Sequence, residues 1–100
     1  MTYSIHFLAL AQQDLLEAGA WYEEQQMGLG TEFLFAVEMS LTELKRTPLI
    51  YRIRFEDVRI ALVHRFPYAL HYIISGREIV ILGILHMSRN PEIGFTRRNL

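Results

Sequence analysis

The sequence contains no cysteine and no uncharged run long enough to cross a lipid bilayer. The absence of cysteine excludes disulfide bonds, Cys-ligated zinc and thiol catalysis. The longest nearly uncharged run, residues 68–76, is far shorter than the roughly 20 apolar residues that a transmembrane helix needs. Residues 1–8 are apolar but carry no Lys or Arg, so we expect a first strand there and not a signal peptide. We therefore expect a cytoplasmic protein without membrane association.

Basic residues are absent from the first 44 positions. That segment holds seven acidic side chains, whereas residues 45–100 hold all ten basic residues and four acids. The two parts carry formal charges of −7 and +6, which sum to −1. Nine of the ten basic residues are Arg, which suits bidentate contacts with carboxylate or phosphate. The asymmetry predicts an acidic helical side and an arginine-rich sheet side, unless these charges serve only to solubilise the two parts.

The length and composition fit one globular domain spanning residues 1–100. Hydrophobic residues make up 51% of the chain and charged residues 21%. His6, His64 and His71 show no metal-ligand spacing, and no Lys follows the glycines in the pattern of a phosphate loop. We expect neither a metal site nor a small-molecule cofactor.

Two helices are predicted in the first half of the chain. Between residues 10 and 26 apolar side chains recur at intervals of three to four, until the glycine-containing link 27–30. Trp21 in this segment is expected to pack in the core. A second helix, capped by Thr31, is predicted to end near residue 46. Its apolar residues recur at steps of three, four and three and form one stripe: Leu34, Val37, Leu41 and Leu44. The short link predicts an antiparallel helical hairpin.

The second half of the chain alternates with a period of two, which is typical of strands. With the N-terminal segment, the strands are predicted over residues 3–8, 51–55, 58–65, 68–75 and 78–87. A two-residue turn at Glu56 and Asp57 would place Arg54 opposite Arg59, an unfavourable pair that a sheet built only for stability would avoid. Arg59 and Arg65 would share one face of a strand, roughly 20 Å apart.

Residues 78–87 are apolar on both faces, which predicts a central strand. Residues 92–100 are expected to form a short tail. The predicted fold class is α+β, in the order β-α-α-β-β-β, with the helical hairpin packed on one face of a mostly antiparallel sheet.

Several short motifs occur in a characteristic order along nearly the whole chain. They are Ala11-x-x-Asp14-Leu15-x-Glu17-Ala18, Trp21-Tyr22, Gly28-Leu29-Gly30-x-x-Phe33, Pro48, Arg65-Phe66-Pro67-Tyr68 and Leu85-His86-x-x-Arg89-x-Pro91. Their order and spacing resemble the RelE/ParE superfamily, toxins of type II toxin–antitoxin modules that are also called plasmid stabilisation proteins. The resemblance implies a toxin that is neutralised by an antitoxin encoded beside it.

One branch of that superfamily cleaves mRNA on the ribosome and holds it on a basic, concave sheet face. The resemblance matches a basic residue of that branch to Arg89, but an expected Arg falls on Ala69 and an expected Tyr falls on Phe95. His86 is a candidate for the missing acid or base, because imidazole titrates near neutral pH. His86 and Arg89 are therefore the candidate catalytic residues, but only if the protein cleaves RNA.

The other branch, ParE-like, inhibits DNA gyrase and has no agreed catalytic residues. The motifs around residues 66–68 and 85–91 are closer to this branch, and a pI of 6.4 is low for a protein that must hold ribosomal RNA. We therefore favour gyrase inhibition without enzymatic activity over RNA cleavage. A non-toxic relic that only binds an antitoxin is a further alternative.

The cognate antitoxin is the expected partner, whichever target the toxin has. Such antitoxins have disordered segments that fold as they wrap the toxin. The segment is expected to cover the helical hairpin or to add a strand to an exposed sheet edge. Its acidic side chains would pair with the candidate binding residues Arg52, Arg54, Arg59 and Arg65.

Overall fold

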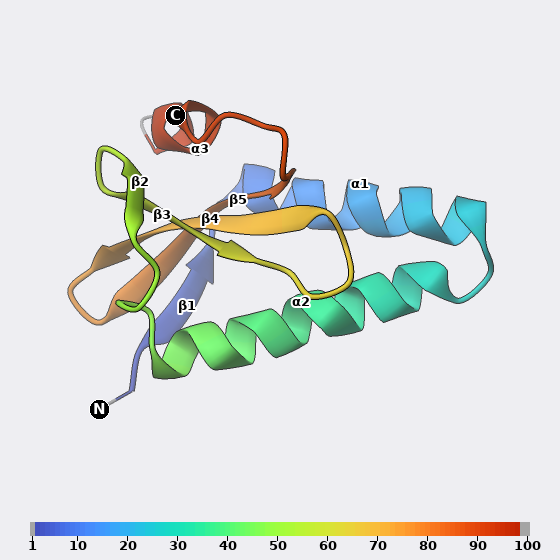
Figure 1. Cartoon of the computed structure of the whole chain (residues 1–100), viewed down its shortest axis with the longest axis horizontal. Helices are drawn as coiled ribbons and strands as arrows, with labels where there is room; N and C mark the ends of the chain where they lie inside the picture. Colours follow the sequence, from blue (N-terminus) through green and yellow to red (C-terminus); the bar gives the residue numbers. More distant parts are fainter. Residues whose placement is uncertain (1, 99–100) are drawn as a thin grey trace.

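The computed structural model describes residues 2–98 as a helical hairpin packed on a five-stranded sheet (Figure 1). The elements follow in the order β1 (Ser4–Phe7), α1 (Ala9–Gln25), α2 (Leu29–Arg46), β2 (Ile53–Phe55), β3 (Val58–Leu62), β4 (Tyr68–Ser75), β5 (Glu78–His86) and α3 (Glu92–Arg97). The α+β class is confirmed. The five observed strands match the five segments expected to be strands, although the expected order β-α-α-β-β-β counts one strand fewer. Residues 92–97 form a helix where a plain tail was expected.

The sheet has the strand order β1-β5-β4-β3-β2. β1 pairs with β5 in parallel, and the other three pairs are antiparallel, which confirms the mostly antiparallel sheet. β5 therefore lies between two strands. It is also covered on both faces, and this explains why its sequence is apolar on both faces.

The link between α1 and α2 is shorter than expected, and Thr31 does not cap the second helix. Gly28 adopts a left-handed φ of 89°, and α2 begins directly after it. The Glu23 carboxylate of α1 accepts hydrogen bonds from the backbone N–H groups of Gly28 (2.9 Å) and Gly30 (3.0 Å). These bonds satisfy N–H groups that a helix cannot satisfy in its own first turn, so the cap comes from the preceding helix and not from Thr31.

Two buried clusters occupy the two faces of the sheet. The larger one joins both long helices to the sheet and includes Ala11, Phe33, Val37, Leu44, Leu70, Tyr72, Ile79, Ile81 and Ile84. Of the predicted stripe on α2, Val37 and Leu44 are fully buried, whereas Leu34 is exposed at the edge. The smaller cluster consists of Val58, Ile73 and Leu82, with Phe95 of α3 packed against it. In Figure 1, α3 and α2 lie on opposite sides of the sheet.

The hairpin of β2 and β3 has the expected turn but a different register. Ile53 pairs with Arg59 and Phe55 pairs with Val58, so a bulge at Arg54 separates the two pairs. The prediction that Arg54 faces Arg59 is therefore wrong, because the bulge removes the opposition of like charges. β3 ends at Leu62, and Arg65 lies in the following turn with a φ of 73°, so Arg59 and Arg65 do not share a strand.

Candidate functional site

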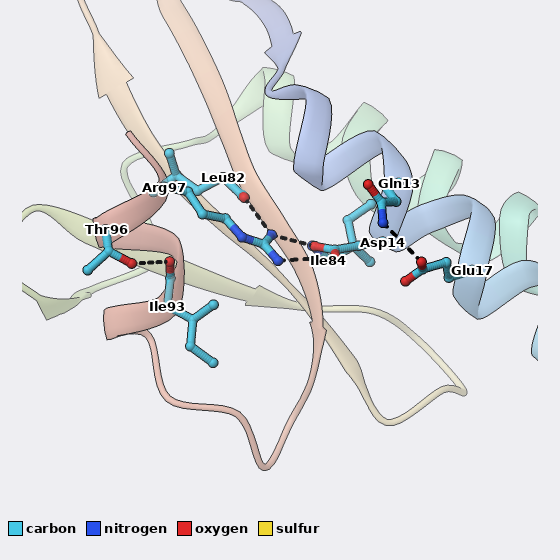
Figure 2. Close-up of polar contacts among 8 residues, drawn as sticks. All are labelled: Gln13, Asp14, Glu17, Leu82, Ile84, Ile93, Thr96 and Arg97. Carbon is cyan, nitrogen blue, oxygen red and sulfur yellow. Dashed lines mark hydrogen bonds and ion pairs between the residues drawn. The ribbon is translucent and has the colours of Figure 1, made fainter. Parts of the chain in front are cut away.

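Beyond Ile81, the outer edge of β5 is closed by side chains and not by a strand. β1 pairs with β5 only as far as Ile81, because the chain turns into α1. Asp14 of α1 then accepts a hydrogen bond from the backbone N–H of Ile84 (3.1 Å), and Arg97 of α3 donates to the carbonyl of Leu82 (3.0 Å). Figure 2 shows Asp14 and Arg97 pointing toward each other across β5. The two side chains replace the hydrogen bonds of a neighbouring strand.

Asp14 and Arg97 also form an ion pair, with Nη1 2.6 Å from Oδ2. Their side chains are only 14% and 15% exposed. A Cβ on Gly83 would lie 2.8 Å from Arg97 Nη1 and 3.2 Å from Asp14 Oδ2, so this position has no room for a side chain. The pair fastens α3 to α1, and we call it the Asp14–Arg97 latch.

α3 covers the sheet face opposite the helical hairpin. A Cβ on Gly94 would lie 3.1 Å from the Cβ of Leu82 and 3.5 Å from that of His71, so the helix backbone sits directly on the sheet. His71 is 1% exposed, and its Nδ1 has no hydrogen-bond partner among the described residues. Burial, followed by the nearby Arg97 cation, lowers the pKa of His71 to about 4. His71 is therefore neutral at physiological pH and acts as a core residue.

The predicted arginines surround a hollow of about 610 Å³ at the free edge of β3. It is lined by the end of α2, the segment 50–54 and residues 60–65. Arg52, Arg54 and Arg65 line it, whereas Arg59 does not. We call this hollow the arginine groove. The structure therefore brings three of the four arginines together.

Arg59 has a different task, which sequence reasoning did not find. It donates hydrogen bonds to the carbonyls of Tyr51 (2.5 Å) and Leu49 (3.4 Å). The hydroxyl of buried Tyr72 donates to the carbonyl of Pro48 at 2.6 Å. Burial raises the pKa of Tyr72, so this hydroxyl keeps its proton. Arg59 and Tyr72 thus hold the loop that carries Arg52. In the sequence, the one sign of such a held loop is Pro48, which has no backbone N–H of its own.

The outer edge of β3 is free of a partner strand along the arginine groove. β2 pairs only with Val58 and Arg59, so residues 60–62 have no paired strand on that side within residues 2–98. Arg65 at the end of the groove forms an ion pair with Glu32 of α2 at 2.8 Å, and both side chains are well exposed. Such an exposed pair contributes at most about 1 kcal/mol and exchanges easily for another carboxylate.

His86 and Arg89 lie near each other, beside α1 and away from α3. Ile84 packs with the helical hairpin, and His86, two residues further along β5, lies on the same side, in a hollow with Trp21. His86 Nδ1 accepts a hydrogen bond from the backbone N–H of Ser88 (3.1 Å) and lies 2.9 Å from its hydroxyl. The side chain of Arg89 makes no hydrogen bond or ion pair with residues 2–98.

The remaining positions matched to the RNA-cleaving branch do not share a sheet face with His86, although Ala69 directly follows Tyr68, the register partner of His86. Ala69 is buried and, lying between Tyr68 and Leu70 of the larger cluster, belongs to the opposite sheet face. Phe95 packs edge-on against Phe55, with ring centroids 5.4 Å apart. The residues of an RNA-cleaving site are therefore divided between the two faces of the sheet.

Residues 2–98 contain neither a candidate metal site nor a candidate membrane-spanning helix. No group of three or more His, Asp or Glu side chains is placed to hold a metal ion. No helix in that range is both long and apolar enough to cross a membrane.

Comparisons with known proteins agree with this fold. A solved structure described as the chromosomal ParDE toxin–antitoxin system from P. aeruginosa superposes with a TM-score of 0.73 at 19% identity, over 84% of this chain and 95% of that chain. The toxin–antitoxin complex RelBE2 from Mycobacterium tuberculosis superposes with a TM-score of 0.61 at 26% identity, over 86% of this chain and 99% of that chain. No curated protein sequence matches the chain.

A protein-family comparison decides the membership. The family described as "ParE toxin of type II toxin-antitoxin system, parDE" matches residues 5–91, which is most of the chain. The expected resemblance to the RelE/ParE superfamily, and to its ParE-like branch, is confirmed. The chain belongs to the ParE toxin family of type II toxin–antitoxin systems.

Proposed function

We propose that this ParE-family toxin is neutralised by a cognate antitoxin and arrests growth by binding DNA gyrase, without catalysing a reaction. The observation that carries the proposal is the position of α3. The helix covers the sheet face on which Ala69 lies, whereas His86 lies on the other face. General acid–base catalysis needs its groups within hydrogen-bond reach of one substrate, and this division supports a binding function over RNA cleavage.

The surroundings of His86 also favour binding over catalysis. No Asp, Glu, Lys or Arg side chain within residues 2–98 forms a hydrogen bond with His86. Its neighbours are Ser88 and the ring of Tyr68, whose centroid lies 5.6 Å away. A general base normally has a third group that orients it, and here none of the charged residues takes that role.

The arginine groove is the proposed binding site for the antitoxin. The free edge at residues 60–62 offers backbone groups to an added strand. Arg52, Arg54 and Arg65 outnumber Glu43, the one carboxylate in the described lining, so the strand should carry acidic residues. Arg59 takes part indirectly, by holding the loop. The alternative site is the helical hairpin, where Phe35 is 63% exposed.

The antitoxin site is tested by measuring the affinity of the purified antitoxin for toxin variants. R52E/R54E should weaken binding at least about 100-fold, because each reversal removes a charge-assisted contact of about 1.5 kcal/mol. K45E is the matched control, since Lys45 carries the same charge outside the groove. An affinity for R52E/R54E within about threefold of the wild type, with a large loss for Phe35→Ala, would move the site to the helical hairpin.

The target is tested by following thymidine and amino-acid incorporation after induction of the toxin in cells that lack the antitoxin. We expect DNA synthesis to fall first, and the purified toxin to inhibit supercoiling by gyrase. A collapse of translation within minutes, with DNA synthesis intact, would instead establish RNA cleavage. Normal growth despite soluble expression would point to a non-toxic relic.

A further inference from the structure

We propose that a second surface, formed by Glu17, Trp21, Tyr68, His86 and Arg89, binds the protein target of the toxin. We call it the Trp21 surface. This inference rests on the proposed function, because it locates the contact through which an inhibitor without a catalytic site must act. It also gives His86 and Arg89 a binding role in place of the catalytic one considered from the sequence.

The Trp21 surface is hollowed on both sides of its aromatic residues. One hollow, of about 240 Å³, is lined by residues that include Glu17, Trp21 and Arg89. A neighbouring hollow of about 350 Å³ is lined by Trp21, Tyr22, Pro67, Tyr68 and His86. Trp21, Tyr68 and His86 line both hollows, so the two adjoin each other between α1 and the end of β5.

Trp21 is exposed although the sequence predicts a core residue. It is 54% exposed and touches the aromatic cluster only by an edge contact with Tyr22, at a centroid distance of 5.1 Å. Tyr22 instead packs among Phe33, Phe66 and Tyr68. The edge contact with Tyr22 supports one side of the indole, so a partner that covers Trp21 gains the burial of a large apolar side chain.

The composition of this surface is that of a protein-binding hot spot. Trp, Tyr and Arg are the residue types that contribute most to the affinity of protein interfaces. Here Trp21 and Tyr68 supply the apolar part, and Arg89 supplies a cation without a partner in residues 2–98. Ser88 orients the His86 ring through Nδ1, which leaves Nε2 free for a partner.

The charges indicate what the partner must present. The Arg89 guanidinium would pair with a carboxylate of the partner, and the two hollows beside it would accept an apolar side chain of the partner. Glu17 lines the same hollow and is exposed, and among residues 2–98 its carboxylate accepts a hydrogen bond from Gln13 alone, at 3.1 Å. A carboxylate at this position repels phosphate, so the surface fits a protein with mixed charges better than a nucleic acid.

The Trp21 surface and the arginine groove have different linings, although they approach each other at residues 65–67, where Arg65 lines the groove and Pro67 lines a hollow of the Trp21 surface. The groove follows the free edge of β3, whereas the Trp21 surface lies beyond the end of β1, next to β5. No described residue lines both. Substitutions on one surface should therefore leave binding at the other unchanged.

The test compares Trp21→Ala and R89E with two matched controls, Met27→Ala for an exposed apolar side chain outside both surfaces and K45E for an exposed cation. Each variant is measured in three ways: growth arrest in cells at equal soluble expression, affinity of the purified toxin for purified gyrase, and affinity for the antitoxin. Circular dichroism checks folding. We expect both test variants to weaken gyrase binding at least about tenfold and to abolish growth arrest, because a central aromatic or Arg anchor contributes about 2 kcal/mol or more. Antitoxin affinity should change less than about twofold.

The outcomes separate this inference from the proposed function. Growth arrest at the wild-type level by folded Trp21→Ala and R89E overturns the Trp21 surface. Loss of antitoxin affinity in the same variants also overturns it, because the surface would then serve the antitoxin. Failure of the wild type to bind gyrase overturns the gyrase proposal alone, since growth arrest still reports whether the surface is needed.

Discussion

The Asp14–Arg97 latch is expected to contribute strongly to the stability of the fold, and Asp14→Ala tests this directly. The substitution removes an ion pair at 2.6 Å, leaves the N–H of Ile84 without its acceptor, and leaves the buried Arg97 cation with the carbonyl of Leu82 but no carboxylate. Breaking a buried pair costs about 3–5 kcal/mol, and leaving an N–H unsatisfied costs about 1–3 kcal/mol. Because both side chains keep some contact with solvent, water compensates in part, and we expect a loss of about 3 kcal/mol.

The loss can be measured as a change in the midpoint of thermal unfolding. For a domain of 100 residues, a loss of 3 kcal/mol corresponds to a decrease of about 15 °C. Asp14→Asn should lose about half as much, because its amide oxygen still accepts from Ile84 while the ion pair is gone. Glu17→Ala is the matched control, one turn along α1 and exposed, and should change stability by less than about 0.5 kcal/mol.

A double-mutant cycle then isolates the pair itself. The double variant Asp14→Ala/Arg97→Met should lose clearly less stability than the sum of the two single variants. Each single variant leaves one buried charge without its partner, whereas the double variant leaves none. A loss below about 1 kcal/mol for Asp14→Ala, or additive effects in the cycle, would refute the idea that the latch fastens α3 to α1.

Three further predictions concern single side chains. Burial and the Arg97 cation depress the pKa of His71 from 6.5 to about 4, so on acidification the unfolded chain takes up a proton that the folded chain does not. The free energy of unfolding should therefore fall by about 2 kcal/mol between pH 7 and pH 5 in denaturant titrations, and His71→Leu should remove this pH dependence. The same pH dependence in His71→Leu would contradict its assignment to His71. Tyr72→Phe leaves the carbonyl of Pro48 without its donor and should cost about 1–2 kcal/mol, with weaker antitoxin binding in calorimetry; full affinity would show that the loop needs no anchor. His86→Phe keeps a ring beside Tyr68 but cannot transfer a proton, so growth arrest should weaken only as far as gyrase affinity does, and loss of growth arrest with unchanged gyrase affinity would favour catalysis.

The latch and the covering helix have a common consequence for function. α3 is short and holds the sheet face through Phe95, Gly94 and the Asp14–Arg97 pair. In addition, Arg98 pairs with Asp57 in the turn of the β2–β3 hairpin. The sheet face opposite the helical hairpin is therefore packed against α3. The surfaces left for partners are the edges of the sheet and the outside of the helical hairpin.

Much of this fold follows from local patterns in the sequence. The stripe on α2 and the two-residue periodicity after residue 50 come from side-chain spacing within single elements, and both gave the right element type. The doubly apolar segment 78–87 identified the central strand, because only a strand covered on both faces carries such a pattern. The order of short motifs was sufficient to place the chain in its toxin family, since order and spacing are properties of the sequence itself.

What only the tertiary structure decided depends on contacts between distant segments. Thr31 was a plausible cap, but Glu23 reaches from the preceding helix and fills that role. Trp21 has the spacing of a core residue, yet the aromatic cluster is already filled by neighbouring rings, and the indole stays outside. A local pattern cannot show which of two suitable side chains occupies a position that either could fill.

The candidate sites illustrate the same limit. Periodicity identified four arginines on the sheet side, but a single bulge at Arg54 and two backbone carbonyls assign Arg59 to the loop and leave three arginines at the groove. Asp14 and Arg97 stand 83 positions apart, and nothing in either neighbourhood predicts that they meet. The sequence gives the chemistry of each side chain. Which side chains meet depends on strand register and on where the chain turns, and long-range packing determines both.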